Sequence, residues 1–216
     1  MTVGSGETAP LAVRLVGQLA LFDGSRSLPL PSSRTTRALF AYLLRADAPV
    51  RRERLCDLFF DIPADPRAAL RWSLTKIRGM LGPRPDLLLT DGETVAIDAA
   101  GFVSDVARVE TMLAGPLPEG EPLLEALNAM VDEPLPEIDL PQLGSYSAWL
   151  AAERSLIDQV RARFFLRAAE SESLTAEQRR RFAQEAERLG GVAEWHGGVS
   201  PRAARPAGSD FEQTIH

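Results

Sequence analysis

The sequence has 216 residues and a net charge of −6, with 45% hydrophobic and 25% charged residues, a composition typical of one globular domain or two small ones. No stretch approaches the roughly 18 apolar residues of a membrane helix, and the N-terminal residues lack a secretion signal, so we expect a cytoplasmic protein with no membrane partner. With Cys56, His196 and His216 as the chain's cysteine and histidines, neither a disulfide framework nor a credible zinc ligand set nor a Ser-His-Asp triad is available. We therefore expect a protein that is not an enzyme and uses no metal or cofactor.

The N-terminal part of the chain predicts strands followed by helices. Residues 11–30 alternate short apolar runs with turn residues, which predicts two or three antiparallel strands. Residues 35–47 follow a serine and carry apolar side chains at helical spacing, which predicts a first helix. A second helix is predicted over residues 51–60, although Arg51 stands where a capping side chain is usual.

A third helix is predicted over residues 66–81, because Asp65 can cap its free amides and Pro66 occupies a position where no donor is needed. One face carries an apolar stripe formed by Leu70, Leu74, Ile77 and Leu81. The opposite face carries Ala68, Trp72, Thr75, Lys76 and Gly79, with Arg71 and Arg78 at its edges. The helix therefore has one face for a core and one for solvent or a partner.

Two further elements complete this first unit, which we place at residues 11–115. Residues 86–98 contain two β-rich runs around Asp91-Gly92, which predicts a hairpin. A helix is predicted from about residue 104 to residue 114.

The second half of the chain is predicted to be helical. Residues 116–144 are acidic and proline-rich, and we expect a hinge there with one short helix. Residues 145–190 predict a helical module, with a long first helix and a last helix that starts at a capping box of Thr175 and Gln178. The apolar face of the long helix consists of Trp149, Leu150, Ile157, Val160 and Phe164. Such a face must be covered, and a homodimer is one way to cover it. Residues 191–216 show no period, and we expect a disordered tail.

Charge is distributed unevenly along the chain. Residues 31–85 hold eleven basic and five acidic side chains, a net charge of +6. Residues 101–153 hold one basic and ten acidic side chains, a net charge of −9. This asymmetry indicates one surface suited to an anionic partner and another that is not.

The order of strands, three helices and a hairpin predicts an α+β fold, a winged helix-turn-helix with an N-terminal antiparallel sheet and a C-terminal wing hairpin, followed by a short all-α module. In such a unit the third helix enters the major groove of DNA. Lys76 is able to donate to a guanine edge, Thr75 to bond a base edge or phosphate, and Trp72 to contact a thymine methyl or a sugar, although a tryptophan there is also common as a packing residue.

Five arginines are candidates for contacts to DNA phosphates. Arg51, Arg52 and Arg54 lie at the start of the second helix, where free amides also favour anions. Arg71 and Arg78 flank the outward face of the third helix. The alternative interpretation of these side chains is a solvated helix surface without a ligand.

Two segments resemble a known family. The run RTTRALFAYLLRADAPVRRERLCDLFFDIPADPRAALRWSLTKIRGMLG resembles the DNA-binding domain of the SARP family of bacterial activators, relatives of OmpR-type response regulators. The later run PEIDLPQLGSYSAWLAAERSLIDQVRARFF is similar to the opening of the bacterial transcriptional activator domain, a helical-repeat module, which is truncated here.

The resemblance implies a transcription regulator that binds double-stranded DNA. By position, the base-facing sites of the family fall on Trp72, Thr75 and Lys76, and a contact to the DNA backbone falls on Arg78. The helical module of the family mediates self-association or contact with RNA polymerase or an effector protein. A different function, a winged-helix protein-interaction scaffold that does not bind DNA, is suggested by the acidic hairpin residues Asp91 and Glu93 and the net charge of −6.

Overall fold

The computed structural model describes residues 9–60 and 65–190. The expected tail at residues 191–216, with His196 and His216, lies outside the described residues.

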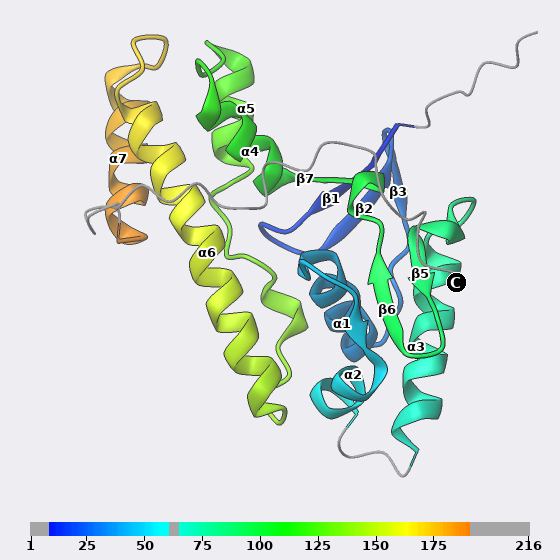
Figure 1. The fold of residues 1–216 in the computed structure, drawn as a ribbon. Helices are drawn as coiled ribbons and strands as arrows, with labels where there is room; N and C mark the ends of the chain where they lie inside the picture. The colour runs from blue at the N-terminus through cyan, green and yellow to red at the C-terminus, as the bar shows by residue number, and fades with distance from the viewer. Residues whose placement is uncertain (1–8, 61–64, 191–216) are drawn as a thin grey trace, which may run out of the picture.

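The described elements follow the predicted order of strands, helices and hairpin (Figure 1). The strands are β1 (Leu11–Arg14), β2 (Ala20–Asp23), β3 (Arg26–Leu28), β4 (Val50–Arg51), β5 (Leu88–Thr90), β6 (Thr94–Ile97) and β7 (Phe102–Ser104). The α-helices are α1 (Arg34–Arg45), α2 (Arg52–Phe59), α3 (Pro66–Met80), α4 (Asp105–Ala114), α5 (Glu121–Asn128), α6 (Gly144–Ala169) and α7 (Ala176–Arg188). Short 3₁₀ turns are η1 (Pro85–Leu87), η2 (Ala99–Gly101) and η3 (Pro136–Ile138). The fold is α+β, with a winged helix-turn-helix at its N-terminal side.

Two small sheets frame the winged helix. The first has the strand order β3-β2-β1-β7 and the second the order β4-β6-β5. The three antiparallel strands at the N-terminus and the β5–β6 hairpin confirm the sequence predictions. Two strands were not predicted: β7 pairs in parallel with β1, and the two-residue β4 pairs with β6.

Helix starts follow local capping chemistry. The side chains of Ser33, Asp65 and Thr175 accept backbone N–H groups at the starts of α1, α3 and α7, and Thr175 forms the predicted capping box with Gln178. Helix α2 begins after Arg51 with no side-chain cap, as its sequence indicates. The first-turn amides of α2 therefore have no side-chain acceptor.

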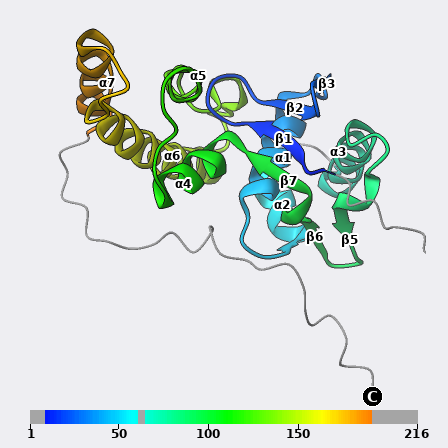
Figure 2. The same cartoon turned by 90° about the horizontal axis from the view of Figure 1, so that it is seen from above.

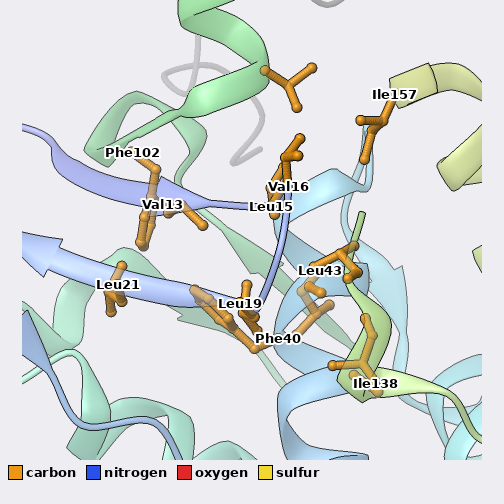
Figure 3. Packing of buried hydrophobic residues seen from close by; sticks show 14 of the residues in the cluster. Val13, Leu15, Val16, Leu19, Leu21, Phe40, Leu43, Phe102, Ile138 and Ile157 are labelled. Atoms are coloured by element: carbon orange, nitrogen blue, oxygen red, sulfur yellow. The ribbon is translucent and has the colours of Figure 1, made fainter. Parts of the chain in front are cut away.

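One apolar core extends from the winged helix to α6. Figure 3 shows side chains of the first sheet and α1 packing together, and Ile138 and Ile157 belong to the same cluster. Phe59 of α2 and Tyr146 of α6 have ring centroids 5.0 Å apart, which extends the contact toward the helix-turn-helix. Helix α6 thus packs against α2 of the helix-turn-helix.

Residues 116–144, the expected hinge, pack against the rest of the chain. They contain α5 and η3, and their buried apolar residues are Leu123, Leu127, Met130, Leu135, Ile138, Leu140 and Leu143. The backbone N–H of Leu135 donates to the carbonyl of Leu15 at 2.9 Å, and Arg154 of α6 donates to the carbonyls of Pro134 and Leu135. These contacts hold the segment between the first sheet and α6.

The apolar face of α6 is covered within the chain. Leu150, Ile157, Val160 and Phe164 are buried, and Trp149 is half-buried against Tyr42 and Tyr146. Helix α7 packs along α6, with the rings of Phe165 and Phe182 stacked 5.7 Å apart. The open face that suggested a homodimer is therefore filled by the chain itself. Among the described residues, no helix is both long and apolar enough to span a bilayer.

Candidate nucleic-acid interface

Helix α3 has the two faces that its sequence predicts. Leu70, Leu74 and Ile77 are buried in the core. Trp72, Thr75 and Lys76 are exposed, and Trp72 keeps 51% of its surface accessible. Both views place α3 at the end of the molecule opposite α7 (Figures 1 and 2). The outward face of α3 is thus not covered by the helical module formed by α6 and α7.

Two of these side chains act as a pair. The ammonium group of Lys76 lies 5.3 Å from the ring centroid of Trp72, one helical turn earlier, in a cation–π contact. This contact restricts the flexible lysine to a position above the outward face. The half-exposed indole ring of Trp72 is therefore an organising element of the face as well as a surface that a ligand can contact.

Trp72 also borders an open hollow of about 470 Å³. Its apolar lining includes Phe59, Phe60 and Leu143, all nearly buried. Trp72 thus lies beside buried apolar side chains while half of its surface stays accessible.

The hydroxyl group of Thr75 donates to the carbonyl of Arg71 at 2.9 Å. In this rotamer its hydrogen is used within the helix, and its oxygen lone pairs remain as acceptors. Thr75 is thus set up to accept a hydrogen bond from a ligand. The amino groups of adenine and cytosine are donors of this kind at the floor of the major groove.

We call the β5–β6 hairpin the wing. A groove of about 680 Å³ lies between the start of α2, the start of α3 and the turn of the wing. We call it the arginine groove because Arg51, Arg52, Arg67 and Arg71 line it. Three acidic residues share the lining and are Glu53, Asp91 and Glu93. The groove thus carries four positive and three negative charges at neutral pH.

The arginine groove includes a residue that the sequence analysis did not select. Arg67 lies in the first turn of α3, and its guanidinium group approaches the carboxylate of Glu53 at 4.0 Å. Both side chains are more than three-quarters exposed, so this ion pair contributes little stability and leaves Arg67 accessible. The sequence signal that could have identified Arg67 as a candidate is its position just after the Asp65 cap, at the start of the third helix.

Cys56 lies at the floor of the arginine groove, partly buried. Desolvation, followed by the nearby carboxylate of Asp57, raises the pKa of its thiol above the ordinary value. The thiol therefore stays protonated at neutral pH, as expected for a packing residue rather than a nucleophile.

The predicted arginines differ in what their side chains contact. Within residues 9–60 and 65–190, the guanidinium groups of Arg51, Arg54 and Arg71 make no hydrogen bond or ion pair. Arg52 donates from Nε and Nη2 to the carbonyl of Asp91, at 3.2 and 3.0 Å. Arg78 donates from Nη2 to the hydroxyl of Thr90 at 3.1 Å. Two of the five predicted arginines are thus engaged with the wing.

The wing turn is shaped by one carboxylate. Asp91 accepts hydrogen bonds from the backbone amides of Glu93 and Thr94 and from the Thr94 hydroxyl. The two backbone hydrogen bonds, led by that from Thr94, lower the pKa of Asp91 below its ordinary value. The acidic residue at the wing therefore has a local structural role and directs its oxygens into the turn.

The comparisons with known proteins found a likeness in structure but none in sequence. No family model matches the sequence, and no curated protein is significantly similar to it. Among solved structures, the chain is similar to EmbR of Mycobacterium tuberculosis in complex with a low-affinity phosphopeptide, at 16% identity and a TM-score of 0.46. The match covers 84% of this chain and 55% of that chain, so the chain spans about half the length of that structure.

Proposed function

We propose that this chain is a sequence-specific DNA-binding transcription regulator that reads the major groove with α3. The observation that carries this proposal is the outward face of α3, where Trp72, Thr75 and Lys76 are exposed while the opposite face is buried. A helix of this diameter fits the major groove and can present such side chains to base edges. The resemblance of the sequence to the SARP family supports the same function.

The proposed roles follow from the chemistry of each side chain. Lys76 donates to guanine acceptors, Thr75 accepts from a base amino group, and Trp72 contacts a thymine methyl or a sugar while it orients Lys76. Arg51, Arg54 and Arg71 contact phosphates, because their guanidinium groups have no partner in the described part of the chain. The start of α2 lacks a side-chain cap, and a phosphate oxygen there would accept hydrogen bonds from the amides of Glu53 and Arg54, since the Arg52 amide donates to the Glu93 carbonyl.

Fluorescence anisotropy with duplex DNA over a series of salt concentrations tests the proposal. A site is first selected from random duplexes and then compared with an unrelated duplex. Each phosphate contact makes the slope of log K against log salt more negative by about 0.9. Three arginines therefore predict a slope of about −3 or steeper. We expect binding to the selected duplex to weaken along this slope as salt rises.

The variant Lys76→Ala tests base reading. It should weaken binding to the selected duplex by about 1–3 kcal/mol and reduce the preference for it over the unrelated duplex. Arg180→Ala is the matched control, since Arg180 is an exposed cation on α7 at the opposite end of the molecule. Equal losses for both variants, or no salt-dependent binding by the unaltered chain, would contradict the proposed function.

For the helical module we propose a protein-contact role, with RNA polymerase or an effector protein as the partner. Leu156 and Leu166 of α6 are each 48% exposed, whereas Leu150, Ile157, Val160 and Phe164 of the same helix are buried. Alternatively, the partner of the helical module is a second copy of the chain. Sedimentation of the chain with and without DNA distinguishes a dimer from a monomer that recruits another protein.

One observation favours the scaffold function as a second candidate. Glu53, Asp91 and Glu93 lie in the same groove as the arginines and would repel a phosphate that approaches them. If DNA footprinting shows no protection by the intact chain while affinity capture retains RNA polymerase subunits, the scaffold function is favoured over DNA reading.

A further inference from the structure

We propose that Arg52 and Arg78 are positioning residues, which fix the wing against α2 and α3 and neutralise no DNA phosphate. Together with their acceptors, Asp91 and Thr90, they form what we call the wing brace. The proposal rests on the proposed function, since the wing matters for binding only if α3 reads DNA. It assigns different roles to arginines that are adjacent in the sequence.

Arg52 joins α2 to the turn of the wing through its backbone and its side chain. Its N–H donates to the carbonyl of Glu93 at 2.8 Å, which continues the pairing of β4 with β6. Its Nε and Nη2 both donate to the carbonyl of Asp91, at 3.2 and 3.0 Å. The Nε–Nη2 edge of a guanidinium is one of the edges that binds a phosphate bidentately, and here this edge is occupied.

Arg78 joins the wing to α3 from the other side. Its Nη2 donates to the hydroxyl of Thr90, at 3.1 Å, one residue before the Asp91 carbonyl that Arg52 holds. Arg78 is less exposed than Arg71, its neighbour two helical turns earlier. The wing is therefore held at two consecutive residues, by one arginine from each helix.

The brace sets the geometry of the arginine groove. Asp91 and Gly92 form one wall of this groove, and Arg51 and Arg71 form part of the other. The Asp91 side chain fixes the turn internally, but neither it nor the turn is buried, so the turn depends on outside contacts for its position. Loss of either brace arginine would remove one side-chain anchor of this wall and let it move more relative to α3, although the pairing of β4 with β6 would remain.

The salt dependence of DNA binding separates a brace from a phosphate contact. Removing a cation that neutralises a phosphate reduces the slope of log K against log salt by about 0.9. Removing a positioning residue lowers affinity at every salt concentration and leaves the slope unchanged. We therefore compare Arg52→Ala and Arg78→Ala with Arg54→Ala, which lies on the same helix as Arg52 and whose side chain has no partner in the described chain.

The variant Thr90→Val tests the brace without changing any charge. It removes the acceptor of Arg78 and retains the shape of the side chain. We expect Thr90→Val and Arg78→Ala each to weaken DNA binding about fivefold, the effect of one ordinary hydrogen bond. Thr90→Ser, which retains the hydroxyl, should bind as the unaltered chain does.

Hydrogen exchange in the free protein provides a readout that does not require DNA. The amide of residue 52, which donates to the Glu93 carbonyl between α2 and the wing, should exchange faster in Arg52→Ala, Arg78→Ala and Thr90→Val, and at the normal rate in Arg54→Ala. Unchanged exchange at this amide overturns the brace even if the chain binds no DNA. A slope that falls by about 0.9 in Arg52→Ala and Arg78→Ala, as in Arg54→Ala, overturns it while the proposed function survives.

Discussion

Arg161 of α6 is a buried charge whose removal should cost less than the removal of its partner. Its side chain is 2% exposed. Its Nε and Nη2 donate to the carbonyls of Met130 and Val131, at 2.7 and 2.8 Å, and its Nη1 binds the carboxylate of Asp158. These bonds fasten the segment after α5 to α6.

The structure gives different expected costs for the two partners. Arg161→Met leaves the carbonyls of Met130 and Val131 without a donor, but it also removes the desolvation cost of a buried guanidinium, so we expect a loss of about 1–2 kcal/mol in the free energy of unfolding. Asp158→Ala leaves that guanidinium buried without a counter-charge. We expect a loss of about 3 kcal/mol, at the low end for a broken buried pair because the Asp158 side chain is 33% exposed.

Urea unfolding at pH 7 and constant salt, followed by far-UV circular dichroism, measures both costs. The double variant Asp158→Ala/Arg161→Met should unfold like Arg161→Met alone, since the buried charge is gone. Arg180→Met, an exposed site on α7, is the control and should change stability by less than about 0.5 kcal/mol. The reasoning is refuted if Asp158→Ala costs less than Arg161→Met or if the double variant costs their sum.

Two further outcomes follow from the wing and its base. Gly101→Ala should destabilise the fold by about 1–3 kcal/mol, because the new Cβ would lie 2.3 Å from Cδ2 of the buried Leu87; an unchanged urea midpoint would contradict this. Because the folded pKa of Asp91 is lowered from 3.8, its carboxylate stabilises the wing turn above that pH and the stabilisation is lost as pH falls through the folded value. Protection factors of the Glu93 and Thr94 amides, measured against core amides of α6, should therefore fall at low pH, and the same fall in Asp91→Asn would count against this cause.

The elements that the sequence predicts are those with local signals. Helix α3 begins at Asp65 and Pro66, α7 begins at a capping box, and the wing is signalled by Asp91-Gly92. Strand β7 carries no such signal, because it has three residues and its parallel partner β1 lies about ninety positions earlier. Pairing over that distance depends on the packed core rather than on the local pattern of apolar residues.

Helix α6 shows a second limit of pattern reading. Its buried residues include Glu153 and Arg161 as well as the predicted apolar face. The later part of α6 is contacted by α7, and the helix also contacts α4, α5 and α2, so it is buried on more than one side. A single apolar stripe is expected on a helix that packs against one neighbour. The number of neighbours depends on the tertiary fold, so the sequence pattern of α6 did not predict burial on its other sides.

The sequence predicts which face of α3 is exposed, but it does not predict which arginines have partners within the chain. The spacing of Leu70, Leu74 and Ile77 fixes which side of α3 turns outward. Arg52 differs from Arg51 and Arg54 because its guanidinium meets the carbonyl of Asp91. That acceptor is a backbone atom 39 residues away, and every residue type supplies such an atom, so no sequence pattern marks it.

The net charge of −6 does not by itself exclude DNA binding, because it sums separate segments: residues 31–85 carry +6 and residues 101–153 carry −9. The arginine groove lies beside α3, whereas the acidic α4 and α5 lie toward the end that carries α7 (Figures 1 and 2). At physiological salt, exposed charges farther apart than the Debye length of about 8 Å are largely screened, so the distant acids weaken the attraction of the groove only slightly. At low salt the screening length grows, and under the proposed function the acids of residues 101–153 would then repel DNA that extends past the groove. We therefore expect the chain to favour short sites over long contacts along the duplex at low salt, a constraint that the total charge alone does not reveal.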